Sequence, residues 1–191
     1  MIRYLLVGLS LILSATANAQ QEQEVSVEES LFGMQTGFLG FWAHNELRLT
    51  NEMALRTEIG FDTAVFGGAL YYDTKYFLIP IIAAEPRWYY NLERRAGNDK
   101  NIRNNSGNFL TIKALYMPDW FLLTNDEVVK PINQLAFVPK YGMRRVYGEH
   151  FSFEAGLGIG VGFQFGKNKD YYSDTDPQAF VDLHLRIGYN F

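Results

Sequence analysis

The stretch AFVDLHLRIGYNF at residues 179–191 alternates between two kinds of side chain. A period of two is the repeat of a β-strand, in which successive side chains point to opposite faces. One face is almost entirely apolar: Ala179, Val181, Leu183, Leu185, Ile187, Tyr189 and Phe191. The other face is mainly polar: Phe180, Asp182, His184, Arg186, Gly188 and Asn190. The stretch therefore predicts a strand that separates an apolar environment from a polar one.

A second stretch, FSFEAGLGIGVGFQF at residues 151–165, repeats the pattern with glycines on its second face. These are Gly156, Gly158, Gly160 and Gly162. In a soluble sandwich, such a face would leave a hole in the core. In a narrow barrel the glycines make room for bulky charged side chains of neighbouring strands. The apolar face, with Phe at both ends, matches a lipid-facing band between aromatic girdles, so we expect an antiparallel transmembrane β-barrel.

Five further segments follow the same rule: 31–43, 53–66, 78–93, 108–117 and 134–146. Residues expected to face outward include Met34, Phe38, Trp42, Trp88, Tyr90 and Leu92. Seven strands are clear, but single-chain bacterial barrels normally have an even number. We therefore expect eight strands, with a short first strand near residues 22–30, where Val25 to Glu28 alternate faintly.

The N-terminus has the pattern of a secretory signal peptide. Arg3 supplies the positive charge, Leu5 to Leu13 form an apolar run, and Ala17-Asn18-Ala19 is a small-x-small cleavage site before Gln20. We expect three parts: a signal peptide at 1–19, an N-terminal segment at 20–30, and the barrel at 31–191. No Cys follows the cleavage site, which argues against a lipoprotein anchor.

Composition supports this interpretation and excludes others. The 191 residues contain no Cys, so a large cooperative structure must hold the fold without disulfides. No internal run reaches the roughly 18 apolar residues of a spanning helix, so a helical membrane protein is excluded. A net charge of -4 gives no reason to expect nucleic acid as a partner.

The connections alternate between short and long. Tyr147-Gly148-Glu149 is a tight turn, whereas 118–133 and 166–177 are long and polar. If the chain ends in the periplasm, these two long loops are extracellular, and the 44–52 and 94–107 connections are periplasmic.

Two motifs resemble known proteins. The ending His184 to Phe191 resembles the C-terminal insertion signal of outer-membrane barrels, which the barrel-assembly machinery reads; Tyr189 and Phe191 would be its aromatic residues. The run Glu85 to Leu92, followed by Asn104 to Phe109, is similar to small outer-membrane β-barrel proteins of Gram-negative bacteria, a largely uncharacterised family. The resemblance covers the chain from about residue 31. It implies the bacterial outer membrane as location, with outer-membrane lipids and lipopolysaccharide as partners, and no cofactor.

The inward faces carry many charges. The positive residues are Arg56, Arg87, Lys113, Lys140, Arg144 and Arg186, and the negative ones are Glu58, Asp62, Glu85, Glu154 and Asp182, with His184 among them. Buried charges must be paired, because the desolvation penalty is otherwise several kcal/mol per ion. Six positive and five negative groups nearly cancel, which predicts a network that fills the lumen. A gate for a narrow ion path is the alternative.

Three functions follow as hypotheses. The first is a non-enzymatic barrel with a structural or surface-interaction role, whose extracellular loops carry any binding function; eight strands leave an interior just filled by side chains. The second is a lipid-modifying enzyme, because His150 and Ser152 resemble the His–Ser pair of outer-membrane lipid A deacylases. That family follows the Ser with Asn, whereas Phe153 follows here, so no catalytic residue is predicted. The acidic residues of the long loops, such as Asp174 and Asp176, match no EF-hand spacing, so no metal site is predicted either. The third is a narrow channel or carrier for a small molecule.

Overall fold

The computed structural model describes residues 25–38, 40–66, 75–124, 130–165 and 177–191. The expected signal peptide at 1–19 lies outside these ranges, as does most of the 166–177 loop. The strands are β1 Ser30–Gly37, β2 Gly40–Arg48, β3 Met53–Phe66, β4 Lys75–Trp88, β5 Asn108–Met117, β6 Leu123–Thr124, β7 Asn133–Tyr147, β8 Phe151–Phe165 and β9 Gln178–Asn190.

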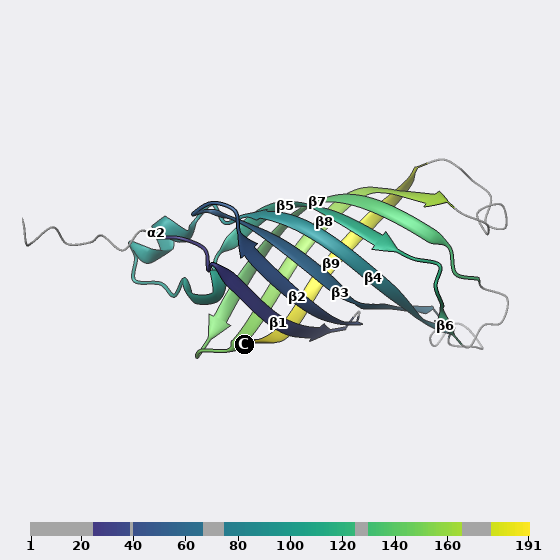
Figure 1. Cartoon of the computed structure of the whole chain (residues 1–191), viewed down its shortest axis with the longest axis horizontal. Coiled ribbons are helices and arrows are strands. Elements are labelled where there is room, and N and C mark those ends of the chain that lie inside the picture. The colour runs from purple at the N-terminus through teal and green to yellow at the C-terminus, as the bar shows by residue number, and fades with distance from the viewer. Residues whose placement is uncertain (1–24, 39, 67–74, 125–129, 166–176) are drawn as a thin grey trace, which may run out of the picture.

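Eight long strands form one closed antiparallel barrel, which confirms the predicted architecture (Figure 1). The order around the barrel is β3-β2-β1-β9-β8-β7-β5-β4, and pairing between β3 and β4 closes it. The two-residue strand β6 adds to β4. We call the end at which β9 finishes the C-terminal end, and the opposite end the loop end.

The eighth strand is not where the sequence suggested. Residues 25–29 form no strand, whereas the predicted strand at 31–43 is divided between β1 and β2, which pair as a hairpin with Gly37 opposite Gly40. Glycine is needed at this turn, because Gly40 has a φ of 143° and a Cβ there would collide with the carbonyl of Phe61. The connection expected at 44–52 shortens accordingly to residues 49–52.

The hairpin also inverts the parity of the inward face. Met34 and Phe38 are exposed, as expected, but Trp42 is only 3% exposed and lies inside the barrel instead of facing outward. The prediction for Trp42 was wrong because the alternation does not continue through the turn between β1 and β2.

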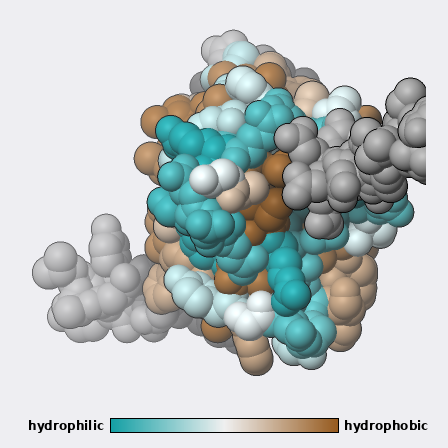
Figure 2. Space-filling view, turned by 90° about the vertical axis from the view of Figure 1, so that its left-hand side faces the viewer, coloured by the Kyte–Doolittle hydropathy of each residue, from teal (hydrophilic) through white to brown (hydrophobic). Residues whose placement is uncertain are grey.

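The C-terminal end is covered by three short segments. Helix α2 (Leu92–Ala96) and the 3-10 helix η2 (Arg103–Asn105) lie in the β4–β5 connection, and residues 25–29 pack beside them. An apolar cluster beneath this cover consists of Val27, Ala54, Tyr89, Leu92 and Phe109. Leu92, predicted to face outward on a strand, is thus buried in α2. Hydrophilic residues cover most of the visible surface at this end (Figure 2).

The outer wall of the barrel is apolar and exposed. It includes Ile59, Ile112, Leu157, Ile159, Val181, Leu183, Leu185 and Ile187, each at least half exposed. None of the helices in the described ranges has the length and apolar character that crossing a membrane as a helix would need.

Candidate functional site in the barrel lumen

The barrel interior contains a layer of charged side chains, which we call the lumen charge network. It includes all twelve residues predicted from the sequence: Arg56, Glu58, Asp62, Glu85, Arg87, Lys113, Lys140, Arg144, Glu154, Asp182, His184 and Arg186. All are buried except Asp62, which is half-buried. Those on any one strand are separated by an even number of positions, and a strand places such residues on one face.

Glu154 on β8 lies at the centre of the network. Its carboxylate accepts hydrogen bonds from Arg144 and, at 2.8 Å, from the side-chain amide of Gln35. It also lies 3.2 Å from the guanidinium of Arg87. The Nε2 atom of His184 lies 2.8 Å from its other oxygen. With three guanidinium groups around it, this carboxylate is held by charge-assisted hydrogen bonds, which are roughly twice as strong as neutral ones.

A second central carboxylate, Glu46 on β2, was missed from the sequence. It accepts bonds from Arg144 at 2.6 Å and Arg87 at 3.1 Å. The Tyr89 hydroxyl also donates to it at 2.9 Å. Burial raises the pKa of Tyr89 above its ordinary value, so the phenol keeps its proton and remains a donor. With Glu46 counted, six carboxylates match the six cations of the network.

The remaining groups form pairs nearer the loop end. Glu58 lies 2.6 Å from both Arg56 and Arg186. Lys140 lies 2.9 Å from Glu85 and 3.3 Å from Asp182. Lys113 also lies 3.3 Å from Asp182. Each of the six cations therefore has at least one carboxylate within 4 Å.

Trp42 marks the boundary of the network toward the loop end. Its Nε1 donates a 2.8 Å hydrogen bond to Asp62, and the guanidinium of Arg186 lies 3.5 Å above its ring. A cation over an indole face is attracted by the ring quadrupole. Trp42 thus presents its polar atom and its π-face to the network while its remaining surface joins an apolar layer.

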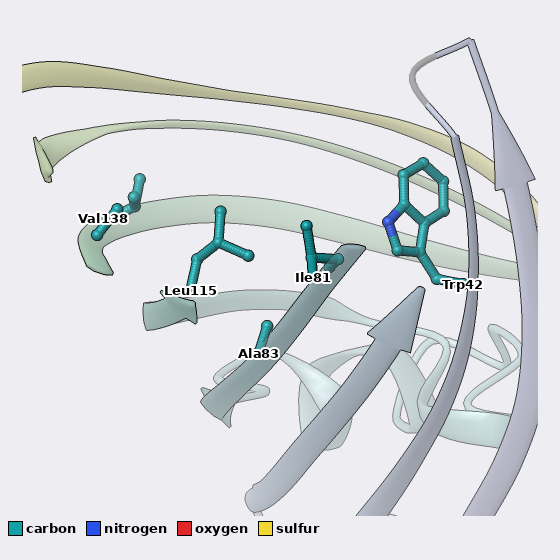
Figure 3. Close-up of a cluster of buried hydrophobic side chains, with 6 residues drawn as sticks. Trp42, Ile81, Ala83, Leu115 and Val138 are labelled. Atoms are coloured by element: carbon teal, nitrogen blue, oxygen red, sulfur yellow. The ribbon is translucent and has the colours of Figure 1, made fainter. Parts of the chain in front are cut away.

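That apolar layer fills the next section of the lumen. It consists of Trp42, Ile81, Ala83, Leu115, Ala136 and Val138, which come from β2, β4, β5 and β7. Figure 3 shows the side chains of this cluster. Met117 and Phe180 pack against it from the loop end. The sequence carries a signal for this layer: inward positions change from Ile81 and Ala83 to Glu85 along β4.

A cavity of about 600 Å³ lies beyond the apolar layer, at the loop end. Its walls come from β4, β5, β7, β8, β9 and the connection after β5. The lining is mostly apolar and includes Phe77, Ile79, Met117, Phe121 and Phe180. This volume is within the roughly 300–1,000 Å³ of small-molecule sites. The lumen therefore contains a paired charged half and an apolar half with space in it.

Glycines of β8 make room for the filled part of the lumen. A Cβ on Gly158 would collide with Val138 and approach Lys140. A Cβ on Gly142, on the neighbouring strand β7, would collide with the ring of Phe109. These positions accept no larger side chain because the interior is occupied by bulky groups from other strands.

His150 and Ser152 do not form a nucleophile–base pair in the structure. His150 lies in the exposed turn before β8, with its ring stacked on Tyr189 at 4.9 Å. Its Nδ1 is 2.8 Å from the carbonyl oxygen of Asn190. Ser152 is buried in the lumen, and its hydroxyl has no hydrogen-bond partner among the described residues.

In the same described ranges, no group of three or more His, Asp or Glu side chains is arranged to hold a metal ion. Comparison of the chain with protein-family models, curated proteins and solved structures found no match.

Proposed function

We propose that the protein spans the bacterial outer membrane as a closed, non-conducting and non-enzymatic barrel, with its binding surface at the loop end. The observation that carries this proposal is the contrast between the two faces of the wall. Ile159 and Val181 are 66% and 63% exposed on the outside, whereas the barrel encloses buried charges such as Arg87 and Glu154. Soluble monomers rarely expose contiguous apolar patches larger than a few hundred Å², so such a wall needs lipid around it.

Aromatic residues at the C-terminal end support the same placement. Tyr189 and Phe191, the residues of the expected insertion signal, lie with ring centroids 5.3 Å apart. Phe151 and Phe32 pack against them at 5.5 Å each. A cluster of this kind fits the aromatic girdle of a membrane barrel. Outer-membrane lipids and lipopolysaccharide then contact the wall, the barrel-assembly machinery inserts it, and the C-terminal end faces the periplasm.

Arginine substitutions at two depths test membrane insertion. Ile159→Arg places a charge in the middle of the apolar wall, where Arg costs roughly 2–4 kcal/mol, falling to about 0–1 kcal/mol near the interface. Phe165→Arg, at the end of the same strand, is the matched control. We expect the first variant to lower the yield of heat-modifiable barrel in outer membranes, and the second to leave it nearly unchanged. Equal yields would contradict membrane insertion.

Conductance tests closure of the lumen. The paired network and the cover at the C-terminal end block an aqueous path, so the purified barrel should give no steady current in planar bilayers. A stable open channel in the wild-type protein would favour the alternative in which the charges gate an ion path.

Lipid A analysis tests the enzyme hypothesis. Loss of a catalytic nucleophile typically removes several orders of magnitude in rate. Because no base among the described residues is hydrogen-bonded to the Ser152 hydroxyl, cells that make wild-type protein, Ser152→Ala protein or none should have the same lipid A acylation pattern. A difference between wild type and Ser152→Ala at equal barrel abundance would overturn the non-enzymatic proposal.

A further inference from the structure

The β1–β2 hairpin is too short to complete the barrel wall at the loop end. The last pairs of its strands are Gly37 with Arg186 of β9, and Gly40 with Asp62 of β3. Among the described residues, Gln178–Leu185 of β9 and Thr63–Phe66 of β3 have no ladder partner on this side. Figure 1 shows the hairpin turning well before the end that β7 and β8 reach. We call this gap the notch.

The notch lies at the level of the apolar outer wall. The outward residues of β9 along it include Val181 and Leu183, both more than half exposed. β1 has 8 residues, fewer than the about 9–11 that a tilted strand needs to cross a bilayer, and β2 with 9 residues only reaches the lower bound. Unpaired backbone at membrane depth is tolerated only where it is buried in protein or lines a cavity. The notch is therefore stable at membrane depth only if another group occupies it.

The inner side of the notch leads toward the loop-end cavity. A small cavity of about 80 Å³ lies in the notch, between Asp62 and Thr63 on one side and residues 180–183 on the other. Phe180 lines both this cavity and the 600 Å³ cavity behind it. Val181 lines both as well, so the half-buried Phe180 and the exposed Val181 lie where the notch meets the apolar interior.

The floor of both spaces is closed. Trp42 is bonded to Asp62 and lies under Arg186, so the polar groups at the base of the notch already have partners. Ile81 and Leu115 are fully buried beneath the larger cavity. A ligand entering here meets a paired floor and walls that are mostly apolar, with Lys130, Gln134 and Gln164 as the polar exceptions. This lining favours a hydrocarbon chain over a polar molecule.

We propose that the notch admits an acyl chain from the membrane into the loop-end cavity, past Phe180. This inference rests on the proposed membrane location. The chain can belong to a bilayer lipid or to a free fatty acid, since both present the same hydrocarbon to the cavity.

Quenching of Trp42 tests the proposal, because its ring lines the notch. The other two tryptophans, Trp88 and Trp120, are replaced by Phe. The barrel is placed in vesicles of brominated phosphatidylcholine, or in unbrominated vesicles to which a brominated fatty acid is added. Quenching that saturates as the share of brominated phosphatidylcholine rises identifies a bilayer lipid. Quenching only with the brominated fatty acid identifies a free fatty acid. No quenching in either arm overturns the proposal.

Met117→Arg tests whether the chain reaches the cavity. A charge in its apolar wall should raise the quencher concentration needed by at least ~10-fold. Met53→Arg, at the opposite end of the barrel, is the matched control and should change nothing. Undiminished quenching in a folded, heat-modifiable Met117→Arg barrel would restrict the chain to the notch and contradict binding in the cavity.

A tryptophan at Ile159, with the three native ones replaced by Phe, separates the two proposals. It reports contact between the outer wall and brominated lipid. If it is quenched while Trp42 is not, the acyl-chain site alone fails. If it is not quenched, the membrane location fails, and the acyl-chain site fails with it.

Discussion

The half of the lumen nearer the C-terminal end contains buried, paired charges, whereas the half nearer the loop end is apolar and contains a cavity of about 600 Å³. The change is seen along two strands: Ala83 precedes Glu85 on β4, and Val138 precedes Lys140 on β7. Space between charged groups would hold water, but an apolar space can stay dry and take an apolar ligand. The comparison indicates that one half seals the barrel and the other half is suited to binding.

The largest effect is expected in the charged half. Glu154→Leu removes the carboxylate that neutralises Arg56, Arg87 and Arg144. Breaking a buried ion pair by removing one partner costs about 3–5 kcal/mol. The free energy of unfolding in detergent, measured by denaturant titration, should fall by that amount.

Glu149→Leu is the control for this prediction. Glu149 also faces an arginine, Arg103, at 3.9 Å, but both side chains are largely exposed. Exposed pairs contribute about 0–1 kcal/mol, so this change should be nearly silent. A similar loss in both variants would show that the network does not stabilise the barrel.

A smaller loss is expected in the apolar half. Leu115→Ala removes a fully buried side chain from the layer below the cavity, and truncations of this kind cost roughly 2–5 kcal/mol. The lower end of that range is expected, because the layer already borders open space and forfeits fewer contacts. The same denaturant titration measures the loss. A loss larger than that of Glu154→Leu would invert the comparison.

The boundary residue should give the smallest effect. Trp42→Phe keeps an aromatic ring under Arg186 but removes the donor to Asp62, which is 2.8 Å away. Leaving a buried acceptor unsatisfied costs about 1–3 kcal/mol, and the lower part of this range is expected because Asp62 is only half-buried. Trp42→Phe should lower the free energy of unfolding less in an Asp62→Asn background than in the wild type. A double-mutant cycle in the same denaturant titration measures this difference. If the losses of the two single variants simply add in the double variant, the hydrogen bond between Trp42 and Asp62 does not link the two halves.

The sequence predicted the long strands and their faces well, because 13 to 15 residues of alternation on β7, β8 and β9 leave only one assignment. It failed at β1 and β2, where a turn between Gly37 and Gly40 inverts the alternation within a short segment. That error placed Trp42 outside the barrel. It also left Glu46 in a connection, so the charge balance lacked its sixth carboxylate.

The notch and the cavity could not be predicted, since both depend on where strands end relative to their neighbours in space. The register of Gly37 with Arg186 positions the notch, and no local pattern near residue 186 reveals it. The cover over the C-terminal end was hidden for a similar reason. It depends on contacts between residues 28 and 105, which are far apart in the chain.

The most direct test of a sealed half and an open half is the reactivity of single cysteines, because the chain has none of its own. Met117→Cys places a thiol in the wall of the loop-end cavity, and Ser152→Cys places one in the charged half. With N-ethylmaleimide on the folded barrel in detergent, the first should be modified rapidly, and the second only after the protein is unfolded by boiling. Equal modification of both folded proteins would contradict the account.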